Sequence, residues 1–118
     1  MKITIYHHPG CSKSRKTLEI IESHGIEPRI VEYLVQPPDA QTLLQLAATL
    51  QVPLADLLRK AEDDFSNAAN SVPLDDDAAL AAWLHNHPKV LQRPIVVDED
   101  ANRAVIGRPP ENVLEIIK

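Results

Sequence analysis

Residues 2–34 read KITIYHHPGCSKSRKTLEIIESHGIEPRIVEYL, and this stretch decides the fold. Residues 2–6 alternate polar and apolar side chains, which is typical of a strand. Residues 12–24 carry apolar side chains at helical spacing and are followed by Gly25, a residue type that commonly ends a helix. The β-branched and aromatic side chains at residues 29–34 predict a second strand. A strand, a helix and a strand in so short a stretch indicate a βαβ unit with parallel strands.

The middle of the chain is predicted to be helical. We expect a helix at residues 39–50 with Asp39 as its N-cap, because aspartate accepts hydrogen bonds from the free N–H groups of a first turn. A short helix should follow at residues 54–60. A third should run over residues 75–87, because its three leading aspartates favour a helix N-terminus. Residues 61–74 are polar and are expected to form a loop or an irregular helix.

The last third of the chain returns to strands. Residues 94–98 and 103–106 predict a hairpin, and the proline pair before residue 111 predicts a final helix that runs to Lys118. A parallel βαβ unit joined to an antiparallel ββα unit is the plan of a thioredoxin-like α/β fold with a mixed four-stranded sheet. We therefore predict a single domain, residues 1–118, with a helical subdomain inserted at about residues 37–88.

Composition narrows the class of protein. A length of 118 residues fits one domain, and 44% hydrophobic with 25% charged residues is ordinary globular usage. The net charge of −5 argues against nucleic acid or an anionic membrane as the main partner. One cysteine cannot form an internal disulfide, and the sequence shows no membrane-spanning run and no signal peptide. We therefore expect a cytoplasmic protein.

The start of the first predicted helix breaks a local rule. Helix N-termini carry partial positive charge and favour acidic side chains. Here Lys13, Arg15 and Lys16, three of the chain's 12 lysines and arginines, lie within four residues at that end. An anion bound there would turn this repulsion into attraction, because free backbone N–H groups and cations both favour a negative charge. The segment is therefore a candidate anion site.

Cys11 lies at the same helix end. A thiol at a helix N-terminus beside cations has a lowered pKa, and the thiolate is a nucleophile. His7 and His8 could add positive charge or accept the thiol proton. Ser14 completes a C-x-x-S motif, the monothiol form of the C-x-x-C redox motif. Without a second thiol, an oxidised or substrate-bound Cys11 has to be discharged by an external thiol.

Other interpretations of these residues fit less well. A free cysteine is often a small buried hydrophobe, but histidine, proline, glycine, serine and lysine do not make an apolar surrounding. A phosphatase loop needs five residues between its cysteine and arginine, and only three separate Cys11 from Arg15. A zinc site built from His7, His8 and Cys11 lacks the paired spacing of structural sites, so no metal is expected. Further along, Trp83 is expected to lie in the core.

Four segments taken together resemble a known family. Residues 6–15 (YHHPGCSKSR) are similar to the active-site segment of the glutaredoxin-coupled bacterial arsenate reductases. Residues 57–60 (LLRK), 92–97 (QRPIVV) and 106–110 (IGRPP) match three later segments of that family in the same order. Residues 113–116 resemble its closing helix. The resemblance covers nearly the whole chain.

This resemblance implies a reaction. Cys11 would attack arsenate to give a thioarsenate, and His7 would help to hold the thiolate. Arg59, Arg93 and Arg108 would bind the oxyanion, a task that suits the planar, permanently charged guanidinium group. Glutathione, a co-substrate, would attack the adduct, and glutaredoxin would reduce the mixed species to release arsenite. No bound cofactor is implied, and the implied fold is thioredoxin-like with a helical insertion.

The same resemblance implies supporting roles for further residues. Ser14, Arg15 and Pro94 would support the site, and the peptide bond before Pro94 would be cis and face the cysteine. Arg29 and Arg103, which match none of the family segments, are interpreted as surface cations.

Two alternatives to an arsenate reductase stay open. The same superfamily contains thiol-stress regulators that bind RNA polymerase. These typically carry C-x-x-C, whereas Ser14 removes the intramolecular switch, and three arginines have no obvious use in a regulator. The other alternative is a glutathione-dependent thiol reductase with a different substrate.

Overall fold

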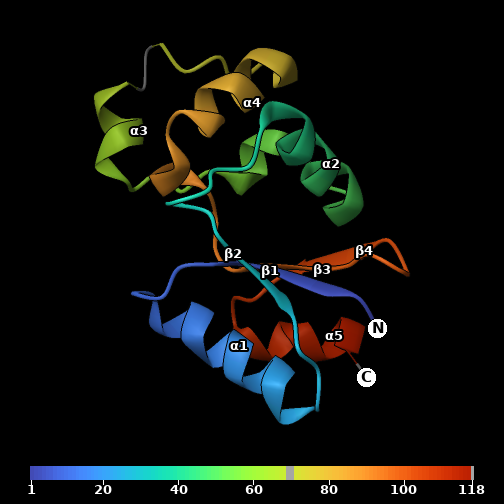
Figure 1. Ribbon diagram of the computed structural model, residues 1–118. Coiled ribbons are helices and arrows are strands. Elements are labelled where there is room, and N and C mark those ends of the chain that lie inside the picture. The colour runs from blue at the N-terminus through green and yellow to red at the C-terminus, as the bar shows by residue number, and fades with distance from the viewer. Residues whose placement is uncertain (69–70, 118) are drawn as a thin grey trace. The chain divides into compact units, whose positions relative to one another are not determined.

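The computed structural model describes residues 1–68 and 71–117 (Figure 1). The chain divides into two compact units, Met1–Gln36 with Arg93–Lys118, and Pro37–Gln92. The second unit begins where the predicted insertion begins and ends slightly beyond it, while the single-domain assignment stays a prediction. No helix among the described residues has the length and apolar character needed to cross a membrane.

The first unit contains the sheet. Its strands are β1 (Ile3–His7), β2 (Arg29–Glu32), β3 (Ile95–Asp98) and β4 (Arg103–Ile106), in the order β2-β1-β3-β4. β1 pairs with β2 in parallel, whereas β3 is antiparallel to both β1 and β4. This is the predicted mixed four-stranded sheet, and the thioredoxin-like α/β plan is confirmed.

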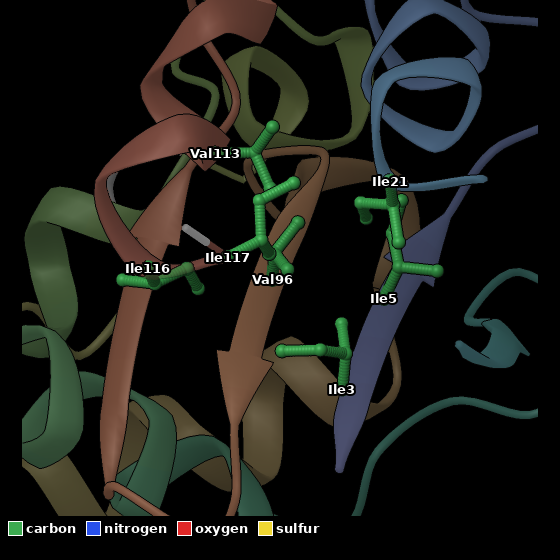
Figure 2. Close-up of a cluster of buried hydrophobic side chains, with 7 residues drawn as sticks. All are labelled: Ile3, Ile5, Ile21, Val96, Val113, Ile116 and Ile117. Carbon is green, nitrogen blue, oxygen red and sulfur yellow. The ribbon is translucent and has the colours of Figure 1, made fainter. Parts of the chain in front are cut away.

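Helices of the first unit cover one face of this sheet (Figure 1). They are α1 (Ser12–Ser23) and α5 (Leu114–Ile117), the latter continuing a 3-10 turn, η3 (Pro110–Val113). Their apolar side chains meet alternate residues of β1 and one residue of β3, Val96, between the two layers (Figure 2). The buried cluster consists of Ile3, Ile5, Ile21, Val96, Val113, Ile116 and Ile117. The core is therefore built from segments that the sequence predicted as strands and helices, while the predicted helix end at Lys118 lies outside the described residues.

Two element ends in this unit have a clear local cause. Helix α1 stops before Gly25, whose backbone has a φ of 75°, a left-handed conformation that glycine adopts without steric cost. Strand β2 is two residues shorter than predicted. The carbonyl oxygen of Glu32 accepts the N–H groups of Val35 (2.9 Å) and Gln36 (2.8 Å), which turns the chain away from the sheet.

The second unit is helical. It contains α2 (Ala40–Leu50), α3 (Asp63–Asn67) and α4 (Asp77–His85), together with the 3-10 turns η1 (Leu54–Leu57) and η2 (Pro88–Val90). Its core consists of side chains from α2, η1, α4 and η2, from the residues that directly follow η1 and η2, and from Val72. The buried hydrophobic residues among those described are Leu43, Leu46, Ala47, Leu54, Leu57, Leu58, Val72, Leu80, Ala81, Leu84, Val90 and Leu91.

Aspartates cap both long helices of this unit. The side chain of Asp39 accepts a hydrogen bond from the N–H of Thr42 at 2.8 Å, as predicted. This bond is the main reason that the pKa of Asp39 lies below its usual value. Asp76 caps α4 in the same way through the N–H of Ala79 at 3.2 Å, so this helix starts two residues later than predicted.

Two expectations for this unit were wrong, those for residues 54–60 and for Trp83. The predicted helix at residues 54–60 is a single 3-10 turn, because the next backbone groups pair with another segment: Leu58 bridges Leu91, and the N–H of Gln92 donates to the carbonyl of Leu57 at 2.7 Å. The stretch at residues 61–74, predicted as a loop or an irregular helix, contains the short helix α3 at residues 63–67, while residues 69 and 70 lie outside the described residues. Trp83 is only half-buried, and its ring stacks on the imidazole of His87 at a centroid distance of 4.2 Å.

Gln51, after the end of α2, gives a test of this local geometry. Its φ of 61° is left-handed, which costs a non-glycine residue roughly 1–2 kcal/mol, whereas glycine loses about 0.5–1 kcal/mol in backbone entropy. We therefore expect Gln51→Gly to raise the free energy of unfolding by about 0.5–1 kcal/mol in urea titrations. The matched change Gln45→Gly, on the exposed face of α2, should lower it by about 0.5–1 kcal/mol. Two changes of the same sign would contradict this explanation.

Candidate active site

Cys11 is the N-cap residue of α1. Its backbone is extended (φ −97°, ψ 122°), and its carbonyl accepts the N–H of Arg15 at 3.0 Å. The first turn contains no acidic residue, as the sequence indicated. The half-buried thiol therefore lies beside backbone N–H groups and cations that no acidic side chain of the turn neutralises.

The segment before Cys11 is a tight turn. The N–H of Cys11 donates to the carbonyl of His8 at 3.0 Å, which places Pro9 and Gly10 at the two central positions. Gly10 does not have a positive φ; a Cβ atom there would lie 3.0 Å from Cε1 of His8. The imidazole of His8 thus lies over Gly10 and accepts its N–H at Nδ1 (3.3 Å). Arg15 adds a bond from Nη1 to the carbonyl of Pro9 at 2.8 Å.

Ser14 organises the other side of the loop. Its Oγ accepts the N–H of His8 at 3.1 Å and lies 2.6 Å from Nδ1 of His7. A hydroxyl has one proton to donate and a second lone pair with which to accept, so Oγ can pair with Nδ1 in either neutral tautomer of His7. Both side chains are buried. Sequence reasoning treated Ser14 only as an absent second thiol, and its hydrogen bonds to two histidines could not be read from the motif.

His7 is held in its neutral form. Burial lowers the pKa of the imidazole below its usual value, and electrostatic interactions with His8 and Arg15 act in the same direction. The carboxylates of Glu32 and Glu22 oppose this shift but do not cancel it. The imidazole hydrogen-bonds to Ser14, and its predicted role at the thiolate stays a prediction.

The lowered pKa of His7 predicts a pH-dependent stability. Below about pH 6.5 the unfolded chain binds a proton at this imidazole that the folded protein does not bind, so the free energy of unfolding should fall as the pH drops. His7→Asn does not titrate and should flatten the profile, measured by urea unfolding from about pH 7.5 down to about pH 5. The exposed His24→Asn serves as the control and should keep the wild-type slope. Parallel profiles for wild type and His7→Asn would contradict the assignment.

Two arginines approach the cysteine from the C-terminal part of the chain. Nη2 of Arg108 donates toward Sγ of Cys11 at 3.7 Å, and Nε of the same residue donates to the carbonyl of Arg93 at 2.7 Å. Burial raises the pKa of the Cys11 thiol. The backbone N–H groups of Ser14 and Lys13 and the guanidinium of Arg93 hydrogen-bond to the sulfur and outweigh burial, so the pKa lies below its usual value.

The loop that carries Arg108 packs tightly against the rest of the site. A Cβ atom at Gly107 would lie 2.6 Å from Oγ1 of Thr17 and 2.8 Å from Cγ of Pro94. The N–H of Gly107 donates to the carbonyl of Pro94 at 2.9 Å. The peptide bond before Pro94 is cis, as predicted; the bond between Arg108 and Pro109 is also cis, which was not anticipated.

The remaining arginines differ in their surroundings. Arg59 belongs to the second unit, where its Nη1 donates to Oε1 of Glu62 at 2.7 Å and its N–H donates to the carbonyl of Val90 at 2.6 Å. The ion pair with Glu62 was not anticipated. Arg29 and Arg103 are exposed, as expected of surface cations.

The part of the chain that the structure describes contains no cluster of side chains suited to a metal ion. Within residues 1–68 and 71–117, no group of three or more histidine, cysteine, aspartate or glutamate side chains could hold a metal ion.

The reactivity of Cys11 can be measured directly. The rate of alkylation by iodoacetamide, followed against pH, should inflect below about 8.5, the usual value for a free cysteine, because the thiolate is stabilised in the folded protein. Arg93→Ala removes one of its donors and should move the inflection to higher pH. Arg29→Ala, an exposed arginine on β2, should leave it in place. An inflection at the ordinary value in the wild type would show that the site does not activate the thiol.

The fold and the site define a thioredoxin-like protein with one activated cysteine and an arginine-rich surrounding. Residues 6–116 match the ArsC family, and the chain belongs to that family. The resemblance inferred from the four sequence segments is thereby confirmed.

Individual relatives extend this comparison. The chain is 45% identical over 119 residues to the uncharacterized protein YfgD of Escherichia coli, covering 98% of this chain and 97% of YfgD. It is 39% identical over 115 residues to an arsenate reductase of Escherichia coli, covering 98% of this chain and 80% of the relative. The structure of an arsenate reductase from Vibrio cholerae superposes with a TM-score of 0.90 at 39% identity, covering 98% of both chains.

Proposed function

We propose that this protein is an arsenate reductase that uses glutathione and glutaredoxin. The observation that carries the proposal is the convergence on Cys11 of the Arg108 guanidinium, the Arg93 guanidinium and two backbone N–H groups. Such a site stabilises a thiolate and favours an incoming oxyanion. The names of the relatives in Escherichia coli and Vibrio cholerae support arsenate as that oxyanion.

The first step forms a bond between sulfur and arsenic. The Cys11 thiolate attacks arsenic(V), and an arsenate oxygen leaves as water after protonation. The arsenate bears two negative charges at neutral pH, so it requires cationic donors, for which guanidinium groups are well shaped. Arg93 and Arg108 supply two of them, and Arg59 is proposed, from the family resemblance, to supply a third.

The second step requires two electrons. Arsenic(V) becomes arsenic(III), and the electrons come from two external thiols, glutathione and glutaredoxin, which end joined as a mixed disulfide. The buried hydroxyl of Ser14 cannot supply them, because it hydrogen-bonds to His7 and has no thiol chemistry. Hydrolysis of the remaining sulfur–arsenic bond then releases arsenite and restores Cys11. This scheme needs no bound cofactor, and the reduced glutathione pool that it uses places the activity in the cytoplasm.

The proposal is tested by arsenate-dependent NADPH oxidation in the presence of glutathione, glutathione reductase and glutaredoxin. Wild-type protein should support turnover that depends on both thiols. Cys11→Ser should abolish it, because serine is not ionised at neutral pH and the chain has no second cysteine. If arsenate gives no turnover while a disulfide substrate does, the protein is instead a glutathione-dependent thiol reductase. If neither substrate reacts and the protein binds RNA polymerase, it is a regulator.

The arginines should divide into two groups. Replacing Arg59, Arg93 or Arg108 by alanine removes a charge-assisted contact worth about 1.5–3 kcal/mol, which corresponds to roughly 10- to 150-fold in kcat/KM for arsenate. Arg29→Ala and Arg103→Ala should change kcat/KM less than about twofold, because both side chains are exposed surface cations. Steady-state kinetics on the five variants measure this difference. Equal losses in all five would show that the anion site is misplaced.

A further inference from the structure

Asn112 makes two hydrogen bonds that the sequence analysis did not anticipate. It lies in η3, and its side-chain Nδ2 donates to the carbonyl of Ile106 at 3.2 Å and to the carbonyl of Arg108 at 3.1 Å. Both hydrogens of the amide are thereby used. The two acceptors lie on either side of Gly107, so one side chain spans the loop that leads from β4 to η3.

This loop carries the arginine that contacts the cysteine. Arg108 reaches Cys11 with Nη2, while its Nε is held by the carbonyl of Arg93. The direction of the Arg108 side chain depends on the orientation of its own backbone. Asn112 binds the carbonyl group of that residue, so it acts on the backbone from which the guanidinium extends.

Packing at Gly107 also restrains this loop. At Gly107 there is no room for a Cβ atom next to Thr17 and Pro94, and the N–H of Gly107 is bound to the carbonyl of Pro94. Contact at Gly107 and the bond from the N–H of Arg108 to the carbonyl of Ile106 at 2.9 Å fix where the loop lies, but neither acts on the carbonyl of Arg108. The amide of Asn112 supplies that second restraint.

We propose that Asn112 is a positioning residue, which holds the loop at residues 106–109 so that the Arg108 guanidinium lies beside the sulfur of Cys11. The expected effect of Asn112 on the reactivity of the Cys11 thiol depends only on this geometry. A further effect, on the binding of arsenate, rests on the proposed function.

The first measurement is the alkylation rate of Cys11 at pH 7, which requires no arsenate. Asn112→Leu removes both donors at similar volume, and displacement of the Arg108 cation should slow alkylation roughly 3- to 10-fold. The control is Asn86→Leu, because Asn86 Nδ2 also donates to a backbone carbonyl, that of Ala82 at 3.1 Å, but in the second unit. This control should alkylate at the wild-type rate.

A double-mutant cycle separates positioning from general destabilisation. Arg108→Ala should itself slow alkylation, and adding Asn112→Leu to it should cause less than about a twofold further change, because the two residues act through one contact. Asn112→Ala removes the same donors with a smaller side chain, and it replaces Asn112→Leu in the cycle if thermal unfolding shows that the leucine variant does not fold.

Three results would overturn the inference. They are an unchanged alkylation rate in Arg108→Ala, an unchanged rate in a folded Asn112 variant, and an equal slowing by the Asn112 substitution with and without Arg108. With an active enzyme, Asn112→Leu should also raise KM for arsenate about 3- to 10-fold, with Arg108→Ala as the upper limit. If the wild type does not reduce arsenate, the proposed function fails, but the alkylation cycle still decides the role of Asn112.

Discussion

The positive end of helix α1 is the constraint on which the rest of the site depends. Its first turn combines free backbone N–H groups with lysine and arginine side chains and holds no acidic residue, so local electrostatics alone would disfavour this helix start. A thiolate at Cys11 compensates part of that charge when it forms, and an oxyanion would compensate more. Folding and chemistry are therefore coupled here, because the arrangement that favours the helix N-terminus is also the arrangement that activates the nucleophile.

Neutral hydrogen bonds keep this charged site in order. Ser14 joins His7 to the backbone of His8 through one hydroxyl group, and the imidazole of His8 accepts the N–H of Gly10. Because His7 is uncharged, it adds no further positive charge to the helix end, and the cationic field at Cys11 comes from arginines and backbone dipoles. The arginines are permanently charged, whereas the two histidines serve mainly to hold the loop.

Much of the fold could be predicted, because periodicity and turn residues act locally. The alternation at Ile3 and Ile5 and the stop at Gly25 were sufficient for the βαβ unit. The failures have non-local causes: residues 58–60 lack a helix because their backbone groups pair with the segment near Leu91. At the site, the sequence singled out Cys11, and the family resemblance named Arg93 and Arg108, which the structure places beside it, while the role of Arg59 stays a prediction. The role of Ser14 in binding two histidines and the amide of Asn112 depend on where loops meet in space, which spacing along the chain does not encode.

The contact between His8 and Gly10 constrains the order in which this loop can change. A side chain at position 10 meets the imidazole ring while His8 is present, but not once that ring is gone. A substitution at position 10 that is harmful in this background can therefore be neutral after a substitution at position 8, and the two positions are not independent. Any side chain at position 10 thus requires a small shift of the His8 ring, so variation of this loop is informative only when positions 8 and 10 are varied together.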